Sequence, residues 1–68
     1  AWGEVMRLSE AFDAWKAAEA RYTAWPGWQT AAMADHALEE LSAIAYQNGY
    51  EPNGSLGLTE WVVREIAG

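Results

Sequence analysis

Residues 5–22 read VMRLSEAFDAWKAAEARY, and the spacing of apolar side chains in this stretch decides the fold. Apolar residues recur at alternating intervals of three and four, which places them on one face of an α-helix: Val5, Leu8, Phe12, Trp15, Ala18 or Glu19, and Tyr22. Most of the positions between them hold residues that favour helices. We expect an amphipathic helix over about 3–23, ending before Pro26 because proline disfavours helix in the residue preceding it.

A second helix is expected over about 28–48. Its predicted apolar face consists of residues at helical spacing, namely Ala34, Ala37, Leu38, Leu41, Ile44, Ala45 and Asn48. The connection over 25–28, Trp-Pro-Gly-Trp, is short enough to make the first two helices antiparallel. Gly49 is expected to take the left-handed conformation that ends the second helix, with Tyr50 packing back on Ile44 or Ala45.

A loop and a short third helix complete the chain. Leu56 is expected to anchor the loop over 51–57 to the core, and Thr59 or Ser55 is the expected N-cap of the third helix. The side chains that this helix should bury are Leu58, Trp61, Val62 and Ile66. A strand hairpin around Asn53-Gly54 is the competing interpretation, but its flanks lack the alternation of a strand. The sequence therefore predicts an all-α fold, a small three-helix bundle of two antiparallel helices plus a short third helix, as a single helical domain over 1–68.

The aromatic content suggests how so short a chain can fold. A domain of 68 residues buries little surface, and the absence of cysteine excludes disulfides and thiolate metal sites. Five tryptophans, three tyrosines and one phenylalanine offer large apolar surfaces in compensation. Trp15 and Trp61 lie on the apolar faces of their predicted helices. We expect these two indoles in a tryptophan-rich core.

The negative charge is concentrated in the second part of the chain. Four acidic and three basic residues in 1–25 give a net charge of −1, whereas six acidic residues and one basic residue in 26–68 give −5. Such a surface repels phosphates and anionic lipid head groups, so direct binding to nucleic acid or to a membrane surface is disfavoured, while a basic protein surface is compatible. No apolar run approaches the roughly 20 residues that span a bilayer, and we expect a cytoplasmic protein.

No residue pattern predicts catalysis or a cofactor. His36 is the only histidine, and although Glu39 and Glu40 lie one helical turn away, a catalytic zinc site takes three protein ligands with histidine prominent. Adjacent helix positions point about 100° apart, so Glu39 and Glu40 do not face each other as an acid–base pair. The serines have no triad partners beyond this single histidine. We expect no enzyme activity, no metal and no cofactor.

The predicted binding residues lie around the first interhelix turn. Tryptophan is enriched at the energetic centres of protein interfaces, and Trp2, Trp25 and Trp28 lie at a chain end or in a turn, where burial is difficult. Two interpretations stay open: these rings either cap the open end of the bundle or bind a partner. The predicted protein-binding residues are Trp25, Trp28, Trp2, Asp35, Glu39 and Glu40.

Three functional hypotheses follow. The first is a small non-enzymatic protein-interaction module or assembly subunit, which binds a protein partner through exposed aromatic rings. The second is an acidic inhibitor of the phage type, whose carboxylates block a basic site on a larger nucleic-acid enzyme. The third is an accessory subunit or a metal-responsive switch centred on His36. A homodimer through the alanine-rich face of the first helix would bury surface that so short a chain leaves exposed, but core packing within one chain is the simpler account.

Overall fold

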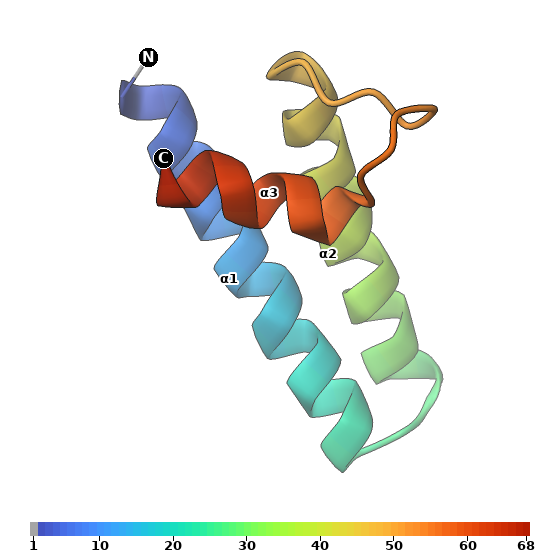
Figure 1. Ribbon diagram of the computed structural model, residues 1–68. Helices are drawn as coiled ribbons and strands as arrows, with labels where there is room; N and C mark the ends of the chain where they lie inside the picture. Colours follow the sequence, from blue (N-terminus) through green and yellow to red (C-terminus); the bar gives the residue numbers. More distant parts are fainter. Residues whose placement is uncertain (1) are drawn as a thin grey trace.

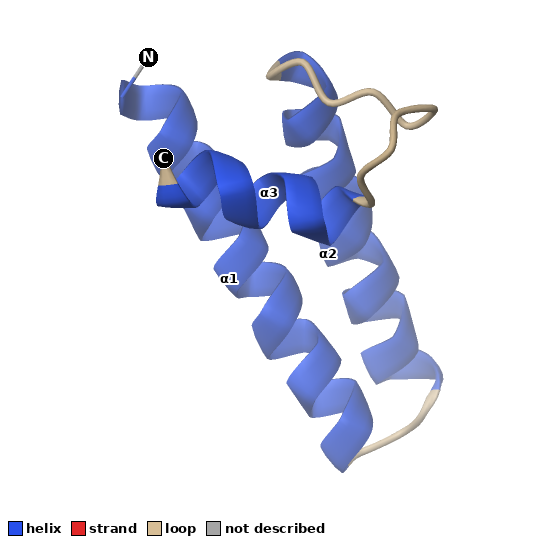
Figure 2. Ribbon diagram, viewed as in Figure 1, coloured by secondary structure: helices blue, strands red, loops and turns tan. Residues whose placement is uncertain are grey.

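The computed structural model shows an antiparallel pair of helices with a short third helix laid across one end of the pair (Figure 1). Helix α1 spans Trp2–Ala24, α2 spans Trp28–Gln47 and α3 spans Leu58–Ala67. The structure describes the backbone of residues 2–68 and the side chains of residues 6–68, and every regular element in that part of the chain is a helix (Figure 2). The predicted all-α three-helix fold is confirmed, and the first two helices end within one residue of their predicted bounds.

The core lies at the end of the α1–α2 pair that α3 covers. Its buried side chains come from all three helices and are Leu8, Leu41, Ala45 and Val62. Ala18 of α1 and Ala34 of α2 are also buried, at 8% and 5% exposed, and continue the contact between the two long helices toward their turn. Because α3 has only ten residues, or about 15 Å of helix, it covers one end of the pair and leaves the turn end without a third layer.

The prediction that tryptophans form the centre of the core is wrong, although Trp15 and Trp61 do pack against it. The buried side chains of the core are aliphatic, and the aromatic rings surround them. Trp15 and Trp61 are half-buried and pack against this cluster, in the company of Phe12 and Tyr50. Both rings lie at the margin of the buried cluster and keep part of their surface in water.

Two predicted core residues are exposed. Tyr22 is 40% exposed because it lies in the last turns of α1, beyond the end that α3 covers. Leu38 is 38% exposed because its position is at the margin of the inward face of α2, about 60° from Leu41. Val5 was also predicted to face the core, but its side chain lies outside the described residues.

The predicted end of α2 is confirmed. Gly49 follows the helix with φ +98°, and the Tyr50 amide donates a hydrogen bond to the Ala45 carbonyl at 3.0 Å. The Asn48 side-chain amide donates to the Ile44 carbonyl at 2.7 Å. Backbone carbonyls of the last turn therefore have partners, and the chain reverses toward the core.

The predicted cap of α3 is wrong. The N-cap residue is Gly57, which offers no side-chain hydrogen bond. Thr59 already lies inside the first turn of the helix, and Ser55 precedes the N-cap by two residues, so neither hydroxyl is at the capping position.

As described, none of the three helices is both long enough and apolar enough to cross a membrane.

Candidate functional site

The turn between α1 and α2 is held in place by its own hydrogen bonds. The Trp25 amide donates to the Arg21 carbonyl at 2.8 Å and continues the hydrogen-bonding pattern of α1. The Thr30 hydroxyl lies 2.6 Å from the Trp25 carbonyl oxygen and 3.2 Å from that of Gly27, so its proton is directed into the turn. Pro26 fixes its own φ angle. These restraints fix the backbone from which the Trp25 and Trp28 side chains extend.

Both indoles of this turn project into solvent. Trp25 is 76% exposed and Trp28 is 80% exposed, the highest values among the large apolar side chains that the structure describes. They border a shallow hollow of about 330 Å³ that is formed by residues 25–30 alone. Trp25 and Trp28 therefore do not cap the open end of the bundle, which was one of the two interpretations of these rings. We call Trp25, Trp28 and the residues between them the tryptophan turn.

Asp35 and Glu39 extend the tryptophan turn along α2. At about 100° per residue, both positions fall within about 20° of Trp28 around the helix axis, and they follow it by about 10 and 16 Å along the axis. Both side chains are exposed. The ion pairs among the described side chains involve neither of them. One face of α2 thus presents an indole followed by two carboxylates.

The other predicted binding residues do not share this face. Glu40 points about 120° away from Trp28 around α2, and its Oε1 lies 3.3 Å from His36 Nε2. The side chain of Trp2 lies outside the described residues. Among the side chains from residue 6 onward, no three His, Cys, Asp or Glu residues come together to hold a metal ion.

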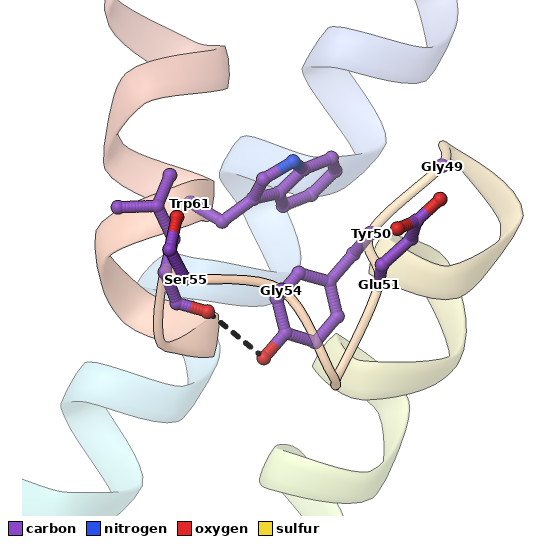
Figure 3. Close-up of a pocket in the computed structure, with 7 residues that line it drawn as sticks. Gly49, Tyr50, Glu51, Gly54, Ser55 and Trp61 are labelled. Atoms are coloured by element: carbon purple, nitrogen blue, oxygen red, sulfur yellow. Dashed lines mark hydrogen bonds between the residues drawn. The ribbon is translucent and has the colours of Figure 1, made fainter.

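A second concave site lies at the opposite end of the helix pair and was not predicted from the sequence. Seven residues line a pocket of about 210 Å³ between the end of α2 and the start of α3: Gly49, Tyr50, Glu51, Gly54, Ser55, Leu56 and Trp61 (Figure 3). Leu56 is half-buried here but is not part of the core cluster that it was expected to join. The only sequence signal was a pair of aromatic residues on either side of a glycine-containing loop.

Comparisons with known proteins do not extend this description. No protein-family model matches the chain, and neither curated proteins nor solved structures gave a match. Function is therefore inferred from the geometry of the two sites.

Proposed function

We propose that this protein is a small non-enzymatic interaction module that binds a partner protein through the tryptophan turn. The observation that carries the proposal is the exposure of Trp25 and Trp28, at 76% and 80%, on a turn that hydrogen bonds hold in place. Rigid aromatic side chains lose little conformational entropy when a partner covers them, which is why tryptophan recurs at the centres of protein interfaces.

The energetic scale supports this role. An indole buries roughly 150–250 Å² when a partner covers it, which is worth about 4–6 kcal/mol per ring before the costs of association. Most of the surface of each ring is in contact with solvent and not with the core, so packing within the protein does not use it. Such a surface is available to a partner at no loss of internal packing.

The carboxylates beside Trp28 favour a partner with a basic rim. Asp35 and Glu39 lie on the same side of α2 as this indole and are exposed. Complementary charges around an aromatic contact increase the association rate and select the orientation of the partner. Their contribution to affinity is expected to be smaller than that of the indoles, because exposed ion pairs are weak and are screened by salt.

The test is a quantitative affinity capture with a matched pair of variants. W25A/W28A removes both indoles, and M6A/V63A removes two other apolar side chains that are each 50% exposed on α1 and α3. We expect W25A/W28A to capture less than one tenth of the amount of partner that the wild type captures, while its helicity by circular dichroism is unchanged. M6A/V63A should capture as much partner as the wild type. Equal capture by wild type and W25A/W28A, or loss of helicity in W25A/W28A, would contradict the proposal.

The acidic inhibitor is the alternative function, favoured by Asp35 and Glu39 having no basic partner among the described side chains. In that case, carboxylates and not indoles would dominate binding. Repeating the capture over a range of salt concentrations separates the two functions, because ion pairing across an interface weakens as salt rises whereas burial of indoles does not. Self-association through the tryptophan turn would appear in sedimentation as a dimer that W25A/W28A abolishes.

A further inference from the structure

The pocket between α2 and α3 has an aromatic wall formed by two rings that meet at a corner. The rings of Tyr50 and Trp61 lie 5.4 Å apart, centroid to centroid, with their planes inclined by 55° (Figure 3). Tyr46 packs on Tyr50 at 5.8 Å from outside the pocket and supports that ring. The Tyr50 hydroxyl is 3.5 Å from the Leu56 carbonyl oxygen, toward which it donates. At this separation the two rings are in contact with each other and form one inclined aromatic wall of the pocket, which Tyr46 and the Leu56 carbonyl support.

The remaining lining supplies a negative charge. Glu51 follows Tyr50 directly, is exposed and lines the same pocket. Its backbone carbonyl accepts a hydrogen bond from the Gly54 amide at 3.0 Å, which closes the turn under the pocket. A Cβ at position 54 would lie only 3.1 Å from that carbonyl oxygen, so another residue there would require a small shift of the turn. The hydrogen bond fixes the backbone of Glu51, which lines the pocket next to the aromatic corner.

Aromatic faces and a carboxylate together favour a cation. The faces of Tyr and Trp rings carry a negative potential that attracts cations, most strongly for tryptophan. Among the side chains of residues 6–68, no cation fills this role: the cation–ring contact found there is that of Lys16 over Phe12, on α1. The chain also carries a net charge of −6, which raises the local concentration of cations.

The size and polarity of the pocket narrow the kind of cation. Its volume of about 210 Å³ is below the roughly 300–1,000 Å³ of sites for drug-sized ligands, so it suits a small head group. A primary ammonium needs several acceptors for its three N–H groups, and the Glu51 and Leu56 carbonyls at this pocket already accept hydrogen bonds from the Gly54 amide and the Tyr50 hydroxyl. A methylated ammonium has no such need and gains from contact with the rings. We propose that this pocket binds a trimethylammonium head group against the Tyr50 and Trp61 rings, with Glu51 nearby.

This site is independent of the proposed function. The loop between α2 and α3 lies at the end of the helix pair opposite the turn between α1 and α2 (Figure 1). This loop lines the pocket, and none of the lining residues belongs to the tryptophan turn. Loss of one site therefore leaves the other intact.

The test is a titration followed by nuclear magnetic resonance. Choline is the probe, 3,3-dimethyl-1-butanol is its neutral isostere, and sodium chloride at equal concentration controls for ionic strength. We expect choline to shift the indole N–H signal of Trp61 and the amides of residues 49–57 with a dissociation constant on the order of 1–10 mM, and the neutral isostere to cause much smaller shifts. Equal shifts from the isostere, or no shift at 50 mM choline, would overturn the proposal.

A matched pair of glutamate variants separates the pocket from the overall charge. E51Q removes the carboxylate at the pocket, and E60Q removes one exposed carboxylate on α3 that does not line it. Both variants change the net charge equally. We expect E51Q to weaken choline binding by roughly two- to fivefold and E60Q to leave it within error. If both weaken binding to the same degree, the effect is one of net charge and the pocket is not the site.

Two peptides identify the source of the head group. One carries trimethyl-lysine and the other has unmodified lysine at the same position in the same sequence. Binding of the trimethyl-lysine peptide at least tenfold more tightly than choline would assign the site to a modified protein, and equal affinity would assign it to the free head group. Equal binding of the two peptides would contradict the preference for a methylated cation.

Discussion

At the scale of single residues, identical side chains on one helix have very different roles. Leu41 is completely buried between the three helices, whereas Leu38, three positions earlier on α2, is 38% exposed. Both leucines belong to the same apolar pattern in the sequence, and helical periodicity alone does not distinguish the centre of a buried face from its margin. The distinction comes from which neighbours the position meets.

These two leucines make a matched prediction. L41A should lower the free energy of unfolding by about 2–5 kcal/mol, because it leaves a cavity among close-packed side chains. L38A should lower it by about 1 kcal/mol or less, because water already reaches that side chain. Urea unfolding followed by circular dichroism measures both values. Similar losses for the two variants would show that the assigned core is misplaced.

At the scale of helices, the ends are set by backbone conformation more than by capping side chains. The N-caps of α2 and α3 are Gly27 and Gly57, and neither provides a side-chain hydrogen bond. The end of α2 depends instead on Gly49, whose φ of +98° is costly for a residue with a Cβ. The open space around this residue means that conformation, and not crowding, requires glycine there.

The end of α2 therefore has a predictable response to substitution. G49A should destabilise the protein by roughly 1–2 kcal/mol, because alanine adopts the left-handed conformation at that cost. G49N should lose less, since asparagine tolerates this conformation better than other side chains. The midpoint of thermal unfolding gives the order of the variants. An alanine variant as stable as wild type would mean that the helix does not end in this conformation.

At the scale of the whole molecule, the two ends of the helix pair differ. One end is covered by α3 and contains the buried core, the half-buried Trp61 and the aromatic pocket. The other end carries the tryptophan turn, where Tyr22 and the two turn indoles are all exposed. The buried core and the small pocket thus lie at one end, whereas the exposed indoles lie at the other.

This asymmetry predicts how tryptophan substitutions divide. W61A should lower the free energy of unfolding by about 2–4 kcal/mol, since Trp61 packs against the core. W25A/W28A removes twice as many indoles but should cost less than about 1 kcal/mol, because neither ring is covered. Chemical denaturation compares the two directly. A larger loss in the double variant would place the turn indoles in the stabilising core.

Local patterns in the sequence were enough to predict the helices and one helix end. Apolar spacing gave α1 and α2 to within one residue, and the Asn48-Gly49-Tyr50 segment predicted the reversal after α2. The short connection at residues 25–27 predicted that the two long helices are antiparallel. These features depend on residues close together in the chain, and so the sequence contains the information directly.

The exposure of Trp25 and Trp28 and the existence of the aromatic pocket were decided only by the tertiary structure. Whether the turn indoles are covered depends on where α3 lies, and its ten residues reach only the other end of the helix pair. The pocket brings together Tyr50 and Trp61, which are eleven positions apart on either side of a loop. Whether a side chain is buried, and whether a pocket forms, depends on contacts between segments that are far apart in the sequence. A local sequence pattern does not specify those contacts. The sequence therefore determined the helices of this protein, whereas the packing of α3 determined which of its aromatic rings are free to bind.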